Sequence, residues 1–168
     1  LQQPRQLLGS AALGVISMRK PLTLLLLGSH AVALAIGFAI GVYALPLLMA
    51  PPSPTQVEIS GAASKATFKA TFRRDLQGSD LLHWGEGVVS IGPDAVMLDG
   101  RLAPGPDYKL YLSPQFVETE ADFLRLKSQM VRIGDVRTFD GFLVTMPAGA
   151  DPANYTTVVV WCESFSQF

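Results

Sequence analysis

Hydrophobic residues follow two different patterns along this sequence. Between Leu22 and Leu45, twenty-four consecutive residues carry no formal charge, and most of them are apolar. About 20 apolar helical residues cross a bilayer core, so this segment predicts a transmembrane helix over residues 21–46. From about residue 61 onward, apolar and polar residues alternate over short segments, which predicts β-strands. The sequence therefore predicts a membrane anchor followed by a β-rich domain over residues 61–168.

The residues that flank the apolar segment predict its orientation. Arg19 and Lys20 precede it directly, whereas no lysine or arginine follows it until Lys65. Positively charged flanks stay in the cytoplasm, so residues 1–20 are expected inside the cell. The protein is then expected to cross the inner membrane once, with its C-terminal domain in the periplasm. A cleaved signal peptide is disfavoured, because the apolar run is too long and Leu48-Met49-Ala50-Pro51-Pro52 is a poor cleavage site.

Several positions in and around the predicted span have candidate roles. Gly37 and Gly41 form a GxxxG pattern, which lets two membrane helices approach closely and would support a homodimer. The simpler explanation of this pattern is that glycine is common in membrane helices in general. His30 is interpreted as tolerated, because no second histidine accompanies it as a haem ligand.

Met18 resembles a natural start of the chain. Pro46 is expected to end the helix, followed by a stiff proline-rich spacer over residues 47–60.

Short alternating segments separated by turn residues predict the strands of the larger domain. The expected strands are 68–73, 88–91, 96–98, 101–102, 108–112, 130–133, 136–139, 142–146 and 156–162. Asp99-Gly100 is typical of a tight hairpin, and Gly134-Asp135 and Asp140-Gly141 are expected turns. Thr119 with Asp122 resembles a helix-capping pair and predicts one short helix. Many short strands with a single helix indicate an all-β domain, either a sandwich or a barrel.

The expected last strand is the most informative segment of the domain. Three consecutive valines follow two threonines, which is the β-branched composition of a buried strand. Because side chains alternate, Val158, Val160 and Cys162 share one face, and the opposite face also begins apolar. The segment is therefore expected to be a central strand that is covered on both sides, and it brings the single cysteine of the chain to its end.

Charge argues against nucleic acid as a partner. The first 55 residues contain three basic and no acidic residues, whereas the rest contains ten basic and fourteen acidic residues. No basic stripe appears in the larger part, so it lacks the electrostatic footprint of a nucleic-acid-binding domain.

Cys162 and His83 are the candidate functional residues. With one cysteine, the chain has no CxxC motif, no internal disulfide and no CxxCH haem attachment. A free thiol in an oxidising compartment is unusual, so Cys162 is either buried and inert or retained for chemistry. His83 could ligate a haem or another metal together with Cys162, but a backbone-bonded, structural His83 is equally consistent with the sequence. No hydrolase motif is found.

The domain resembles the DM-thirteen domain, an electron-transfer domain that also occurs as a membrane-anchored single domain in bacteria. The resemblance covers about residues 66–168 and rests on His83 with Gly85-Glu86-Gly87, Pro104-Gly105-Pro106-Asp107-Tyr108-Lys109-Leu110-Tyr111-Leu112, Pro147-Ala148-Gly149, and Tyr155 through Phe165. It implies an extracytoplasmic redox role in which a cysteine, here Cys162, acts as a bare thiol or holds a prosthetic group. It names no redox partner.

Two classes of function therefore remain open. One is an anchored redox or electron-transfer domain that works through Cys162. The other is a non-catalytic binding module of the cell envelope in which Cys162 is a packing residue.

Overall fold

A computed structural model describes residues 12–168, with side chains from Lys20 onward. The chain divides after Gly41 into two compact units, which are described separately.

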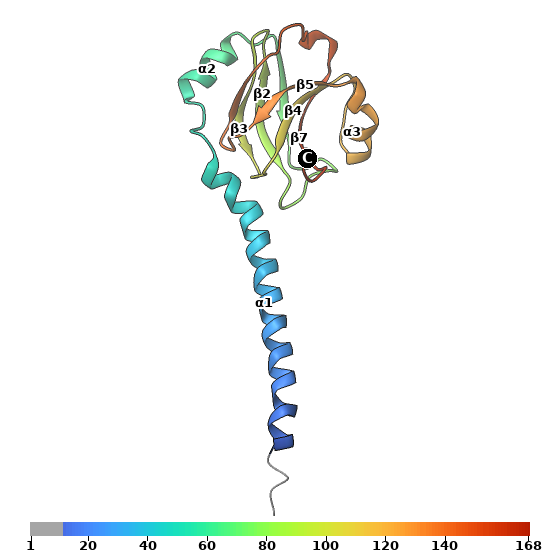
Figure 1. The fold of residues 1–168 in the computed structure, drawn as a ribbon. Coiled ribbons are helices and arrows are strands. Elements are labelled where there is room, and N and C mark those ends of the chain that lie inside the picture. The colour runs from blue at the N-terminus through green and yellow to red at the C-terminus, as the bar shows by residue number, and fades with distance from the viewer. Residues whose placement is uncertain (1–11) are drawn as a thin grey trace, which may run out of the picture. The chain divides into compact units, whose positions relative to one another are not determined.

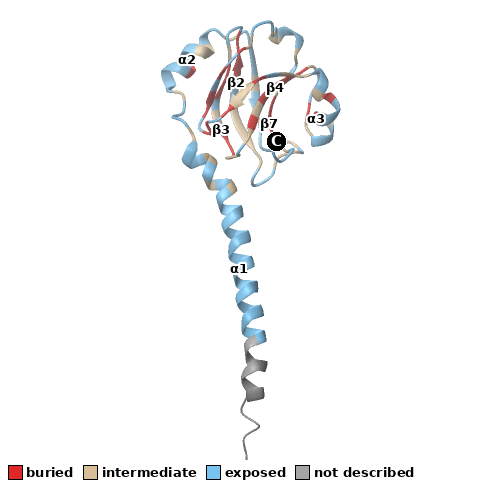
Figure 2. Ribbon diagram, in the orientation of Figure 1, coloured by how far each residue is buried: buried red, intermediate tan, exposed pale blue. Residues whose placement is uncertain are grey.

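The described part of the first unit, from Ala12 onward, lies within a long helix, α1, which covers Ala12–Met49. Its stretch Lys20–Met49, 30 residues long, is long and apolar enough to cross a membrane, and its side chains are largely exposed (Figure 2). Pro46 does not end α1, contrary to the sequence prediction. A proline removes one backbone donor without preventing the next residues from remaining helical, and the helix stops only before the tandem Pro51-Pro52, which restricts Ala50.

The spacer is shorter than expected, because a second helix follows it. α2 covers Gln56–Ser64 and buries Ile59 against the β domain. Its start is a full capping box, in which Thr55 and Glu58 satisfy each other's backbone N–H groups. The expectation of an extended spacer to residue 60 and of a single helix in the domain was therefore wrong. The Thr-x-x-Glu pattern was visible in the sequence.

The rest of the chain forms two antiparallel sheets (Figure 1). The first has the order β1-β2-β3-β6, from Phe68–Phe72, Gly85–Ile91, Ala95–Leu102 and Phe142–Thr145. The second has the order β5-β4-β7, from Val131–Val136, Tyr108–Ser113 and Thr157–Cys162. A core of buried residues from both sheets lies between them, including Val89, Leu98, Leu110, Phe142 and Val160. The predicted all-β sandwich is confirmed.

Two of the predicted turns lie inside strands. Asp99-Gly100 is part of the continuous β3, and Gly134-Asp135 is part of β5. Gly100 pairs with Gly87 of β2, whose φ is +127°, and a Cβ on Gly100 would lie 2.0 Å from the Glu86 carbonyl oxygen. The glycine therefore serves a close approach of two strands and not a hairpin. The turn at Asp140-Gly141 is confirmed, with Gly141 at φ +79°.

The predicted short helix is confirmed as α3, Glu120–Leu126. Thr119 accepts a hydrogen bond from the Asp122 N–H, and the Asp122 carboxylate accepts one from the Thr119 hydroxyl. Phe123 and Leu126 are fully buried and pack on the outer face of the second sheet, against Tyr111, Val159 and Trp161. Short 3-10 helices cover Lys127–Gln129 and Pro152–Asn154.

Candidate functional site

The sequence predicted that β7 would be a central strand, but β7 lies at the edge of its sheet. Its two faces are nevertheless both covered. Val160 and Cys162 face the core between the sheets, whereas Val159 and Trp161 face the aromatic cluster under α3. The apolar pattern correctly indicated two covered faces, but it carries no information about the number of hydrogen-bonded neighbours, so the edge position was missed.

Cys162 is a free, buried thiol that is 3% exposed. Its backbone pairs with the segment that follows β7: its N–H donates to the Gln167 carbonyl over 2.6 Å, and the Gln167 N–H donates back over 3.4 Å. We call residues 163–168 the tail. The tail thus pairs with the outer edge of β7 at the level of the cysteine.

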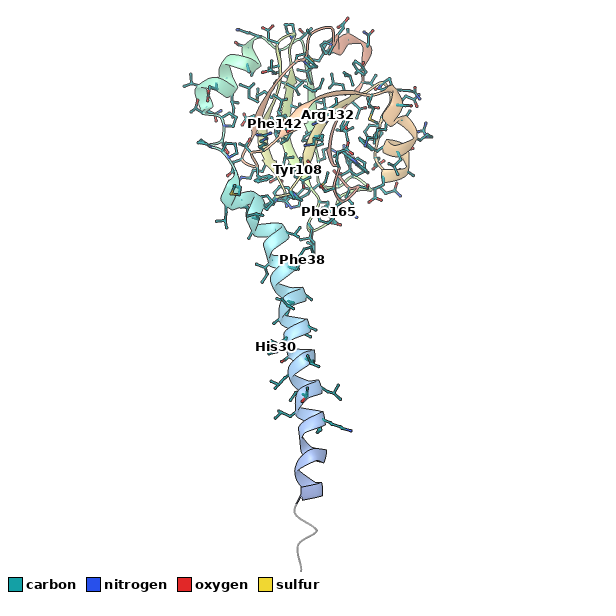
Figure 3. All side chains as sticks on the ribbon, in the orientation of Figure 1. His30, Phe38, Tyr108, Arg132, Phe142 and Phe165 are labelled. Carbon is teal, nitrogen blue, oxygen red and sulfur yellow. The ribbon has the colours of Figure 1, made fainter. Side chains whose placement is uncertain are left out.

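Tyr108 is the cross-strand neighbour of Cys162. The hydrogen-bonded pair lies one residue further along, where the Glu163 N–H donates to the Asp107 carbonyl over 3.1 Å. Tyr108 and Cys162 therefore form a non-hydrogen-bonded pair, the kind in which side chains approach most closely. Burial raises the pKa of the Tyr108 hydroxyl, and smaller contributions come from Cys162 and Asp80. Tyr108, labelled in Figure 3, is a buried residue of the β domain.

The Pro-Gly-Pro-Asp segment before β4 is shaped around this tyrosine. A Cβ on Gly105 would lie 2.4 Å from Cζ of the Tyr108 ring, so only a glycine lets the segment lie over the ring. Asp107 then accepts a hydrogen bond from the Lys109 ammonium over 2.6 Å and one from the Ser164 hydroxyl over 3.0 Å. The motif therefore seats Tyr108 and connects β4 to the tail.

His83 lies in the loop before β2 and is held by Asp80. Its Nδ1 is 2.9 Å from an Asp80 carboxylate oxygen, and the same carboxylate accepts the backbone N–H groups of Leu82 and His83. The hydrogen bond with His83 is the largest of the effects that lower the pKa of Asp80. The His83 side chain is 26% exposed. The His83 ring is thus bonded to the Asp80 side chain, and the backbone of His83 bonds to Asp80 as well.

A pocket of about 90 Å³ opens beside His83. Tyr108 and His83 both line it, together with aromatic and aliphatic residues that include Phe72, Trp84 and Phe168. Cys162 is not part of the lining. Of the predicted site residues, the structure places His83 at the pocket and Cys162 behind Tyr108, in the core.

The donor groups near the pocket do not fit a haem or another metal centre. Within the described residues, no three His, Cys, Asp or Glu side chains gather in a way that would hold a metal ion. Zinc and copper sites need three or four ligands. A cavity of about 150 Å³ accommodates benzene, so a pocket of about 90 Å³ is far too small for a haem macrocycle.

Glu163, the neighbour of Cys162 in sequence, has its charge balanced. Its carboxylate accepts hydrogen bonds from the Tyr111 hydroxyl and, over 2.6 Å, from the Lys127 ammonium. Burial is the largest single effect and alone would raise the pKa of Glu163, but the two hydrogen bonds and the positive charges of Lys127 and Arg132 together lower the pKa. Burial, followed by the bond to Glu163, raises the pKa of Tyr111 to about 12. Lys127, which is far away in sequence, thus offsets the negative charge of Glu163 next to Cys162.

Tyr108, Asp80 and Lys127 were not identified from the sequence as parts of the site. The alternation of β4 places Tyr108 on the same face as Leu110, and this was a signal that could have been used. Asp80 lies three residues before His83 within one turn, and this spacing also suggests a contact. Lys127 approaches Glu163 through the packing of α3, which local sequence patterns do not reveal.

Comparison with known proteins gives the family of the domain. The family model described as Electron transfer DM13 matches residues 71–168, which include β2 to β7, His83, Tyr108 and Cys162. Neither the curated proteins nor the solved structures gave a match. The matched region covers more than half of the chain and contains nearly all of the β domain, so the chain belongs to the DM13 electron-transfer family.

Proposed function

We propose that this protein is a membrane-anchored, extracytoplasmic electron-transfer domain in which the Cys162 thiol is the redox group. The observation that carries the proposal is the position of the single free cysteine, which lies at the end of β7 beside Tyr108, where its backbone pairs with Gln167. Family membership supports the electron-transfer class. The donor set argues for a bare thiol over a ligated metal or haem, so His83 as a cofactor ligand is the weaker version of this proposal.

A bare thiol transfers electrons most simply by exchange with a disulfide of a partner protein. The Cys162 thiol loses its proton, and the thiolate attacks one sulfur of the partner disulfide. A mixed S–S bond forms, the partner S–S bond breaks, and the departing sulfur takes up a proton. Cys162 is thereby oxidised and the partner cysteine is reduced. Because Cys162 is 3% exposed and its side chain faces the core between the sheets, the domain has to open locally before the sulfur atoms meet.

Replacing Cys162 with alanine is expected to leave the fold intact and to abolish this exchange. We expect a covalent adduct of the wild-type chain when native membranes are quenched with acid, alkylated and separated without reductant. The adduct should disappear on reduction and be absent in Cys162→Ala. Val160→Ala is the matched control, because it removes a side chain from the same buried face of β7 and keeps the thiol. No reducible adduct in the wild type, or an unchanged one in Cys162→Ala, would contradict the proposal.

The alternative function is that of a non-catalytic binding module of the cell envelope. The deep burial of Cys162 beside Val160 favours it, because a packing cysteine occupies just such an environment. In that case Cys162→Ser should be destabilised by roughly 1–3 kcal/mol, the cost of burying an unpaired hydroxyl, and no thiol-dependent adduct should form.

The periplasmic location of the domain and the single span of the inner membrane remain proposals. They rest on Arg19 and Lys20 before the span and on the absence of positive charge directly after it. Alkaline phosphatase fused after Phe168 is expected to be active. An inactive fusion whose β-galactosidase counterpart is active would reverse the orientation. Pairing of spans through Gly37 and Gly41 is compatible with the open space around both glycines and also stays a prediction.

A further inference from the structure

The outer edge of β7 presents backbone groups that point away from β4. Tyr108 and Cys162 form a non-hydrogen-bonded pair, and the register between β4 and β7 continues from there without a shift. Because the two kinds of pair alternate along an antiparallel ladder, Val160 and Val158 also belong to non-hydrogen-bonded pairs, and their N–H and C=O groups point away from β4. Cys162 shows the same direction, because its own N–H and C=O pair with Gln167 on the outer side.

The tail occupies only one end of this edge. Gln167 pairs with Cys162, whereas the outward N–H and C=O groups of Val158 and Val160 have no hydrogen-bond partner among the described residues. Val160 is nevertheless only 9% exposed, so its backbone groups lie in a recess. Backbone groups in such a place are costly to leave unpaired, and a free strand edge is a template for a further strand.

The recess is the pocket beside His83. Val158 and Val160 line it, and so does Phe72 at the end of β1. β1 and β7 are edge strands of their sheets, so the pocket lies between one edge of each sheet. On the opposite edges, β5 and β6 contact each other. The free edge of β7 therefore borders a pocket whose opposite wall is apolar.

An extended polypeptide segment matches the spacing of these backbone groups. A segment about 4.8 Å from β7 would place one residue opposite Val160 and another, two positions further, opposite Val158. Each of the two would donate its N–H to the valine carbonyl and accept the valine N–H. The segment would thus add a short strand to the second sheet, beside the position where Gln167 already pairs with Cys162.

The pocket also specifies the side chains of such a segment. Directly opposite residues share a face, and Val158 and Val160 face the core between the sheets, so both paired side chains would enter the pocket. Its walls there include Phe72, Leu102 and Tyr108, which favour apolar groups. One water needs about 10–15 Å³ of such a volume, so a pocket of about 90 Å³ holds roughly six heavy atoms or a few more. Two valine side chains contain that many atoms.

We propose that the outer edge of β7 at Val158 and Val160 binds an extended segment of a partner protein by strand addition, with small apolar residues at alternate positions. A second copy of this chain does not fit. Antiparallel pairing of Val160 with Val158 of the copy would bring Thr156 of the copy to the position that Gln167 occupies opposite Cys162. Binding needs only the backbone edge and the pocket, so the proposal goes beyond the electron-transfer role and stands independently of it.

The test uses the full chain, labelled with nitrogen-15 in detergent micelles, and the peptide acetyl-Ser-Val-Thr-Val-Ser-amide. Binding is followed by the backbone amide resonances, and the amide protons of Val158 and Val160 should shift downfield on titration. Two peptides with one N-methyl group each are matched to one another. Methylation of the second valine removes a donor that faces β7 and should weaken binding at least tenfold, because a hydrogen bond is lost and the methyl group meets the strand. Methylation of the threonine changes an amide that faces away and should leave the affinity within about twofold.

Two variants of the chain complete the test. Val158→Pro removes only an outward N–H and no bond to β4, so the fold should persist and the unmodified peptide should bind roughly threefold to tenfold more weakly. Cys162→Ala should bind the peptide as the wild type does, which separates this proposal from the electron-transfer role. If Val158→Pro does not fold, the two methylated peptides still decide the matter. The proposal is overturned if the unmodified peptide does not bind, if the shifts centre away from β7, or if the two methylated peptides bind equally well.

Discussion

Replacing Gly100 with valine is expected to destabilise the β domain by more than about 3 kcal/mol, and folded protein should be scarce. A Cβ at this position would lie 2.0 Å from the Glu86 carbonyl oxygen and 2.7 Å from the Gly87 Cα. Both obstacles are backbone, so no side-chain rotation relieves the clash. The strands would have to separate within the β2–β3 ladder, at the third of its seven residue pairs. Thermal unfolding followed by circular dichroism measures the loss.

Gly61→Ala is the matched control for this substitution. Gly61 lies in α2, and nothing lies within 4 Å of the position that its Cβ would take. Alanine favours the helical conformation over glycine, so this variant should be more stable by roughly 0.5–1 kcal/mol. A Gly100→Val domain with the wild-type melting temperature would show that the two strands do not need this close approach.

Replacing Trp161 with alanine is expected to cost about 3–5 kcal/mol. Trp161 is 1% exposed, and its ring stacks on Phe123 with centroids 3.9 Å apart and planes 12° apart. Phe168 packs edge-on against the same ring at 5.4 Å. The substitution therefore removes the contact that holds α3 and the tail to the outer face of β7. Denaturant unfolding followed by far-ultraviolet circular dichroism gives the difference in stability.

Trp161→Phe is expected to lose much less stability, because it retains an aromatic face opposite Phe123. The exposed Phe116 supplies a second control: Phe116→Ala deletes an aromatic ring that is 61% exposed and should be nearly neutral. A Trp161→Ala variant that loses no more stability than Phe116→Ala would contradict the assignment of Trp161 to the centre of the aromatic cluster under α3.

Sequence patterns predicted the fold class because alternation and β-branched runs report directly on burial. They placed β1, β4, β6 and β7 almost correctly, together with α3. They failed where a glycine could serve either a turn or a close approach of two strands. Asp99-Gly100 and Gly134-Asp135 resemble turns, but the need for glycine at position 100 comes from Gly87 on another strand. Constraints imposed by a partner strand are invisible in a local window.

The candidate site was less accessible to prediction for the same reason. Cys162 and His83 stand out by rarity, because the chain has one cysteine and two histidines. The rarity of a residue does not predict which other residues lie near it. The structure places only His83 of the two at the pocket. Tyr108, the residue that connects the pocket to the cysteine, looks like an ordinary strand residue in the sequence. Its role depends on the pairing of β4 with β7, which are about fifty residues apart.

The backbone pairing of Cys162 with Gln167 has a kinetic consequence. Only two hydrogen bonds, of 2.6 and 3.4 Å, link the tail to the outer edge of β7 at this point, while β7 remains paired to β4 along its whole length. The tail is also held by the Ser164–Asp107 hydrogen bond and by the packing of Phe168 against Trp161. Opening of the Cys162–Gln167 pair by detachment of the tail therefore also disrupts the aromatic cluster under α3. Hydrogen exchange of the Cys162 amide should consequently follow the stability of that cluster, so substitutions that loosen the cluster should speed this exchange.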